Sequence, residues 1–196
     1  MALLACFFLS MAQPAVSQSV DRFVTVRGDT LSLVLTGVED FKVMYKKPGK
    51  EKVHSMSKER VFSVIHANGK EEFIYQVDSL EDNEYSIQQM QHYIWGWQDA
   101  GTYHNGWTGI VGLASGVTSA YLGPIFGLIP SGVVIVLIGG RSPRMEGRKT
   151  PHPEWMNDEA YVEGYLTRAR AKKVRNAAIG SLAGYLAGLV ILNNRP

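Results

Sequence analysis

The sequence predicts an α+β protein, in which a small antiparallel β-barrel-like domain of the SH3-like or Sm-like kind is followed by transmembrane α-helices. Two observations favour this class. Short runs of alternating apolar and polar residues, separated by turn residues, fill positions 21–78. Beyond them, residues 100–140 contain no Asp, Glu, Lys or Arg, and a second apolar run covers 177–192. An uncharged stretch longer than about 20 residues is typical of a membrane-embedded segment.

The charges are unevenly distributed along the 196 residues. The net charge of +2 is too small to indicate a nucleic-acid partner. Residues 21–105 carry ten basic and thirteen acidic side chains, whereas residues 141–175 carry nine basic and five acidic ones. Opposite biases on either side of an apolar segment follow the positive-inside rule. We therefore expect these two regions to lie on opposite sides of a membrane.

The N-terminal segment 1–17 has the composition of a signal peptide. It is apolar and ends in Ala15-Val16-Ser17, which resembles a small-x-small cleavage site. An uncleaved anchor and a lipid-modified Cys6 are the alternatives. Cys6 is the single cysteine, so the chain can form no internal disulfide.

The predicted β domain at 21–78 shows no pattern of a catalytic or metal site. Its strands end at turn signals that include Gly28-Asp29 and Asn68-Gly69, the latter a strong hairpin signal. We interpret His54 and His66 as ordinary surface residues, and the lysine-rich run 46–52 as a solvated hairpin tip. Small barrels commonly serve as binding modules, and by this fold analogy we expect the same here.

The remaining segments are predicted from charge and apolar patterning. We expect an amphipathic interfacial helix at 79–105, a broken transmembrane segment at 106–140 and a loop at 141–156. A basic amphipathic helix at 157–175 and a transmembrane helix at 176–193 follow. Gly123-Pro124 and Pro130 interrupt the segment 106–140, so either one kinked span or a hairpin of two short helices is compatible with it. The charge bias favours a single crossing.

The helical half contains a duplication with an offset of 68 residues. Residues 93–125 align with 161–193, because Tyr93, Gly96 and Trp97 match Tyr161, Gly164 and Tyr165. Each copy continues into an apolar segment with glycines four residues apart, a spacing that lets membrane helices approach closely. We expect the two apolar segments to pack on each other, in preference to forming a homodimer, through Gly112, Gly116, Gly180, Gly184 and Gly188.

Two further groups of side chains indicate a membrane surface. An interfacial aromatic belt is predicted from Trp95, Trp97, Tyr103 and Trp107. A basic cluster that attracts anionic lipid or sets orientation is predicted from Arg168, Arg170, Lys172, Lys173 and Arg175. Two more specific interpretations are less favoured. One is a ligand cage made by the aromatic residues, and the other is a metal site made by His92, Asp99 and His104.

Several short motifs together resemble a family of uncharacterised bacterial envelope proteins. They are Gly28-Asp29, Asn68-Gly69, the run 96–100 (GWQDA), the run 122–130 (LGPIFGLIP), the run 161–165 (YVEGY) and Ala171-Lys172-Lys173. The resemblance implies a signal peptide, a small β domain and C-terminal glycine-rich membrane helices, and it implies no activity.

The function that we expect is therefore non-enzymatic. An exported β domain would act as a binding module, and glycine-packed helices would anchor it in the bacterial inner membrane with the domain in the periplasm. The expected partners are the lipid bilayer and an envelope protein within a larger assembly; self-association is left open. No catalytic, cofactor or metal site is predicted, because the sequence contains no known catalytic motif. A small transporter or channel component built from the duplicated helices is the alternative.

Overall fold

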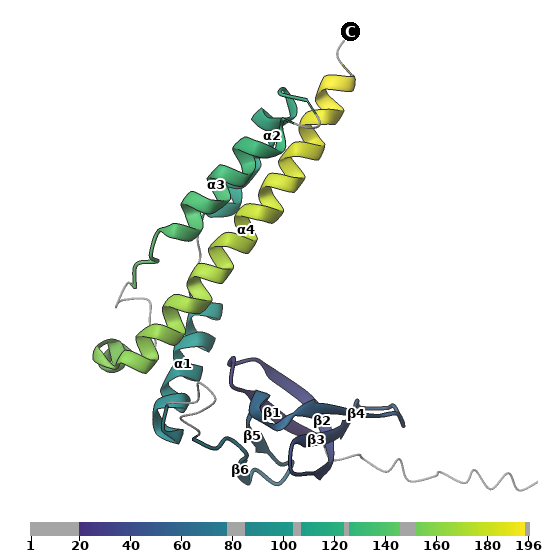
Figure 1. Ribbon diagram of the computed structural model, residues 1–196, viewed down its shortest axis with the longest axis vertical. Helices are drawn as coiled ribbons and strands as arrows, with labels where there is room; N and C mark the ends of the chain where they lie inside the picture. Colours follow the sequence, from purple (N-terminus) through teal and green to yellow (C-terminus); the bar gives the residue numbers. More distant parts are fainter. Residues whose placement is uncertain (1–19, 78–84, 104–106, 124–125, 146–151, 195–196) are drawn as a thin grey trace, which may run out of the picture.

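The chain forms a β-sheet domain beside one end of an elongated helical bundle, which is the predicted α+β class (Figure 1). The computed structural model describes residues 20–77, 85–103, 107–123, 126–145 and 152–194. The predicted signal peptide at 1–17 lies outside the described residues. The bundle comprises α1 (Ile87–Tyr103), α2 (Thr108–Ala120), α3 (Leu128–Gly140) and α4 (Glu159–Asn193).

The described part of the β domain is an open antiparallel sheet with the strand order β4-β3-β2-β1-β5-β6. Its strands are β1 (Asp21–Thr25), β2 (Thr30–Val38), β3 (Lys42–Lys46), β4 (Val53–Ser57), β5 (Val61–Ile65) and β6 (Glu71–Phe73), and the short 3-10 helix η1 (Lys58–Arg60) precedes β5. The predicted Asn68-Gly69 turn lies between β5 and β6, where Gly69 has a φ of +83°.

The prediction of a barrel is wrong, because the sheet does not close. Closure would require the edge strands β4 and β6 to pair with each other. β6 is only three residues long and exposed throughout, so it offers little surface for such a pairing. Instead, α1 covers one face of the sheet, where Met90 and Ile94 are buried with Val24, Phe62 and Tyr75. The opposite face has its own apolar core of Phe23, Leu33, Val43, Val61, Val64 and Ile74.

The helices α1 and α2 follow one another along α4 and run parallel to it (Figure 1). The register shows this direction, because Gly109 lies against Gly180 and Leu113 lies against Gly184. The helix α3 runs the opposite way, from Gly127 beside Tyr185 to Gly139 beside Val174.

The segment 106–140 is therefore a hairpin of two helices, and the single broken span favoured by the sequence is wrong. Gly123 has a φ of +85°, a left-handed conformation in which a residue with a Cβ atom would be strained. The hydroxyls of Ser119 and Ser131 are 2.8 Å apart in a buried hydrogen bond between α2 and α3. This polar contact and the turn at Gly123 favour a reversal of the chain between α2 and α3 over one kinked helix.

The hairpin also corrects the expected relation between the two charged regions. The chain runs along the bundle in α2, returns in α3 and runs along it again in α4 (Figure 1). The β-sheet and the described basic residues, Arg141 and those at 168–175, thus lie toward the same end of the bundle, not on opposite sides of the apolar helices. The two helices predicted at 157–175 and 176–193 are one continuous helix, α4, which begins at Glu159. The loop 141–156 ends in a short 3-10 helix, η2 (Pro153–Asn157).

Candidate functional site

The predicted packing glycines lie at the contact between α2 and α4. A Cβ atom at Gly112 would lie 2.2 Å from the carbonyl oxygen of Ala177, and one at Gly116 would lie 2.0 Å from that of Ser181. Gly180 and Gly184 are equally close to the backbone of α2, while Gly188 faces Ala120. Backbones can approach this closely only where side chains are absent, so the interface depends on these glycines.

The same kind of contact recurs between α1 and α4, with the 68-residue offset of the predicted duplication. A Cβ atom at Gly96 would lie 2.1 Å from the carbonyl oxygen of Tyr161, and one at Gly164 would lie 2.1 Å from that of Tyr93. The contacts are reciprocal, since each of these glycines meets the residue three positions before its equivalent in the other copy. The α1–α2 pair and α4 are thus related by an approximate two-fold axis along the bundle.

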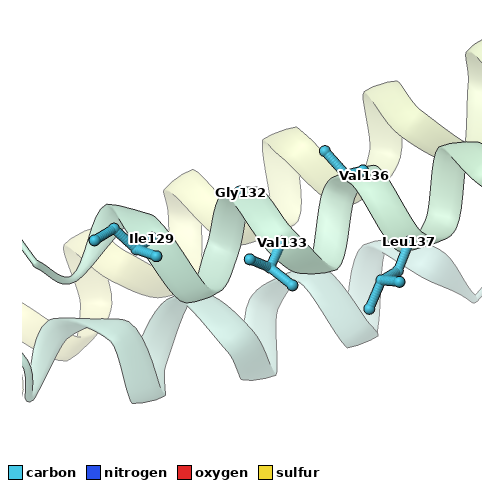
Figure 2. Close-up of a pocket in the computed structure, with 5 residues that line it drawn as sticks. All are labelled: Ile129, Gly132, Val133, Val136 and Leu137. Carbon is cyan, nitrogen blue, oxygen red and sulfur yellow. The ribbon is translucent and has the colours of Figure 1, made fainter.

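The outer surface of the apolar helices carries large aliphatic side chains. A shallow apolar pocket of about 450 Å³ lies on α3. Figure 2 shows the residues that line it, Ile129, Gly132, Val133, Val136 and Leu137. The side chain of Val136 is 72% exposed. Exposed aliphatic residues continue over α2 and α4 at Ile110, Leu113, Ile179, Leu182, Leu186 and Val190. Among the described residues, α4 alone is both long and apolar enough to cross a membrane; α2 and α3 are shorter apolar helices.

The predicted aromatic belt is divided between two places. Trp95 and Trp97 belong to α1 at the sheet end of the bundle, whereas Trp107, 73% exposed, lies at the start of α2. Trp97 packs against Gly28 in the β1–β2 turn, where a Cβ atom would lie 2.5 Å from its ring. The side chain of Tyr103 lies outside the described part of the chain.

An aromatic stack that the sequence did not indicate joins α1 to η2. The rings of Trp95 and Trp155 are nearly parallel, with centroids 4.5 Å apart. His152 stacks on Trp155 at 4.1 Å, and His92 lies 5.2 Å from the same ring. The stack fixes the loop that leads into α4 against α1, although Trp95 and Trp155 are 60 positions apart in the sequence.

Two carboxylates, Asp158 and Asp99, add hydrogen bonds between α1 and the start of α4. We call these bonds and the aromatic stack together the clamp. Asp158 caps the helix by accepting a 2.9 Å hydrogen bond from the amide of Tyr161, and its other oxygen lies 2.9 Å from Nδ1 of His92. Burial opposes ionisation of Asp158, but these hydrogen bonds outweigh it and lower its pKa. Asp99 accepts a 2.7 Å hydrogen bond from the hydroxyl of the fully buried Tyr161.

Burial raises the pKa of Asp99, and the Tyr161 hydrogen bond only partly opposes this rise. Burial and the same hydrogen bond raise the pKa of Tyr161 well above its ordinary value. His92 and Asp99, two of the three residues in the less favoured metal interpretation, thus each contact the first turn of α4. His104 lies outside the described residues, and within those residues no group of three potential metal ligands converges.

A partly enclosed cavity of about 250 Å³ lies between the sheet and α1. One wall is the face of α1 that carries Trp95 and Gln98, and Gln98 also donates to the carbonyl oxygen of Gly28 at 3.2 Å. Mixed apolar and polar lining is typical of small-molecule and side-chain binding sites. The lining residues are Arg22, Val24, Thr30, Phe62, Ile65, Glu71, Gln91, Ile94, Trp95 and Gln98.

The predicted basic cluster contains residues with different contacts. Arg168 lies over the ring of Trp97 at 5.0 Å, and the ammonium of Lys172 donates to the carbonyl oxygen of Gly101 at 2.8 Å. Lys173 reaches the carbonyl oxygen of Arg141 at 3.5 Å. Arg170 and Arg175 are exposed on α4.

The two histidines of the β domain have structural contacts. His54 stacks on Tyr45 with ring centroids 5.7 Å apart. His66 lies 3.4 Å from Asp21 and 3.3 Å from Glu72.

Comparisons of the chain with protein-family models, curated proteins and solved structures gave no match. The resemblance to bacterial envelope proteins therefore stays a prediction.

Proposed function

We propose that this chain is a non-enzymatic integral membrane protein, in which α2, α3 and the apolar part of α4 form a membrane anchor. The β-sheet and α1 form a water-exposed binding domain, which we call the head. The observation that carries the proposal is the distribution of side chains in the bundle, which is the reverse of that in a water-soluble helical bundle. Glycine, alanine and serine fill the α2–α4 contact, whereas large aliphatic residues face outward. In water this surface would be costly, but in lipid it is the expected arrangement.

The helices of the proposed anchor are slightly shorter than the hydrocarbon core of a typical membrane. α2 and α3 have 13 residues each, or about 20 Å at 1.5 Å per residue. The apolar part of α4 from 176 to 193 spans about 27 Å. A hydrocarbon core of about 30 Å can adapt to shorter helices by local thinning and by reorientation of flanking side chains.

The head and the basic segment would share one side of the membrane. For a bacterial inner membrane we propose the exported, periplasmic side. The apolar segment 1–17 precedes the other apolar segments in the sequence, and an earlier apolar segment usually dominates orientation. The basic segment alone would favour the opposite orientation, so sidedness is a direct test of this part of the proposal.

The cavity between the sheet and α1 is the proposed binding position of the head. Its lining offers the aromatic ring of Trp95, the amides of Gln91 and Gln98, and the charges of Arg22 and Glu71. Such groups can recognise a polar side chain of a partner protein by hydrogen bonds and by packing on the ring. The partner would belong to a larger envelope assembly.

The alternative, a transporter or channel component, has less support. It was suggested by the duplicated helices, but the two copies meet backbone to backbone at Gly112, Gly116 and Gly184. A substrate path between α2 and α4 would require this contact to separate.

Photo-crosslinking in intact cells tests the binding role. A photoreactive amino acid replaces Gln91, which lines the cavity, and in a matched control it replaces Lys50 in the β3–β4 turn. We expect one protein adduct of constant mass from position 91 and none of that mass from position 50. Identical adducts from both positions, or none from position 91, would contradict a specific binding role for the cavity.

A further inference from the structure

The charged and apolar side chains of α4 form three successive layers. Glu159 and Glu163 lie in its first turns, five cations lie between positions 168 and 175, and no charged residue follows within the helix. From Leu166 to Asn193 the helix contains no acidic residue. An order of acidic, basic and apolar layers matches the succession of water, lipid phosphate and hydrocarbon at a membrane surface.

Four residues from three helices lie at the boundary between the basic and apolar layers. Lys173 contacts the carbonyl oxygen of Arg141, directly after the end of α3. Asn176, the neighbour of Arg175, lies against Gly109 in the first turn of α2, which begins just after Trp107. We call the group of Trp107, Arg141, Lys173 and Arg175 the headgroup belt.

Three of the four belt residues are available to an external ligand, whereas Lys173 is half-buried and donates to the carbonyl oxygen of Arg141. Trp107 is 73% exposed, and both Arg141 and Arg175 are exposed. Among the described residues, none of the ion pairs involves a cation of the belt. Unlike Arg141 and Arg175, the residues Arg168 and Lys172 lie in the turns closer to the sheet and are held by a tryptophan ring and a backbone carbonyl.

We propose that the headgroup belt binds the phosphate groups of anionic phospholipids in the membrane that holds the chain. This inference rests on the proposed membrane anchoring. Arginine offers several N–H donors that match phosphate oxygens, and exposed tryptophan favours the headgroup region. The belt adjoins the exposed aliphatic surface of α2, α3 and α4, so a lipid whose phosphate contacts Arg141 or Arg175 can lay its acyl chains along that surface.

Selective fluorescence quenching tests the proposal on the full chain in vesicles. The bilayer contains equal amounts of zwitterionic phosphatidylcholine and anionic phosphatidylglycerol, and one of the two lipids carries bromine near the carbonyl end of its acyl chains. Bromine quenches only nearby tryptophans. The difference between the unmodified chain and a Trp107→Phe variant isolates the signal of Trp107 from those of Trp95, Trp97 and Trp155.

The belt variant carries Arg141→Gln, Lys173→Gln and Arg175→Gln. A matched control removes the same charge from the head by Lys46→Gln, Lys47→Gln and Lys50→Gln. We expect brominated phosphatidylglycerol to occupy the surroundings of Trp107 about fivefold in preference to phosphatidylcholine. This ratio corresponds to about 1 kcal/mol, the attraction of one basic side chain to an anionic membrane surface. This preference should disappear in the belt variant and persist in the control.

Each other outcome overturns a definite statement. Equal quenching by both lipids in the unmodified chain, or a preference that survives in the belt variant, would overturn lipid selectivity and leave membrane anchoring intact. A preference lost equally in the control would show a general charge effect and would also overturn the belt. No quenching of Trp107 by either lipid would overturn the anchoring itself.

Discussion

Gly96 and Gly164 occupy equivalent positions in two helices that touch backbone to backbone. Each faces the carbonyl oxygen of the tyrosine three residues before its counterpart, Tyr161 and Tyr93, and a Cβ atom would lie 2.1 Å from that oxygen in both cases. The two helices thus form a symmetric contact within one chain. The contact continues through Gly116 into the apolar part of the bundle.

Replacement of Gly116 by alanine should destabilise the bundle. The added Cβ atom would lie 2.0 Å from the carbonyl oxygen of Ser181, so the helices must separate, at a cost of about 1–3 kcal/mol by analogy with overpacked cores. Gly132→Ala is the matched control, because no atom lies within 4 Å of the added Cβ. Thermal unfolding in detergent micelles measures both variants. Equal melting temperatures for the two variants would refute the role of the glycine contact.

The hydroxyl of Tyr161 should contribute measurably to the clamp between α1 and α4. Tyr161→Phe removes the hydrogen bond to Asp99 and leaves a half-buried carboxylate with fewer partners, which costs about 1–3 kcal/mol. Tyr45→Phe serves as the control, because that hydroxyl makes no hydrogen bond among the described residues. Urea titration followed by circular dichroism should place only the Tyr161 variant at a lower midpoint. A midpoint unchanged by Tyr161→Phe would show that the bond is dispensable.

Asp99 should make the protein less stable as the pH rises. Its pKa in the folded chain is raised above the ordinary 3.8, so the folded state binds the proton more tightly than the unfolded state does. Stability therefore falls as the pH rises from about 3.8 through the raised pKa, and is constant above it. Asp99→Asn removes this contribution. The difference in melting temperature between the two proteins should change across that window, and a constant difference would contradict the raised pKa.

The stack of Trp95 on Trp155 predicts an optical signal. Two indole rings with centroids 4.5 Å apart are close enough to couple electronically, and we expect a paired positive and negative band in the circular dichroism spectrum. Trp155→Ala should abolish the pair of bands, whereas Trp107→Ala should preserve it, because Trp107 lies outside the stack. If the bands survive in the Trp155 variant, the loop before α4 is not clamped on α1.

Local patterns in the sequence predicted much of this structure. Alternation and turn residues located the strands. Gly112, Gly116, Gly180 and Gly184, which were singled out by their spacing, lie where α2 and α4 approach closely. These features depend on residues a few positions apart. The open sheet depends instead on whether β4 meets β6, a long-range pairing that α1 replaces.

The clamp could not be predicted for the same reason. Trp155 lies in a segment rich in Pro and Gly that reads as a loop, and its partner Trp95 belongs to another helix. One local signal was present, because Pro153 and the cap residue Asp158 mark an ordered entry into α4. The sequence is compatible with the hairpin of α2 and α3. The charge asymmetry alone favours a single crossing instead.

Labelling of single cysteines in sealed membrane vesicles tests the central claim most directly. In a Cys6→Ser background, cysteine replaces Lys50 in the head, Ser142 after α3 or Asn194 after α4, and each variant reacts with a membrane-impermeant maleimide. The hairpin and the membrane anchor predict that positions 50 and 142 react from the same side and position 194 from the other. Reaction of position 142 together with position 194, or of all three positions from one side, would contradict the account.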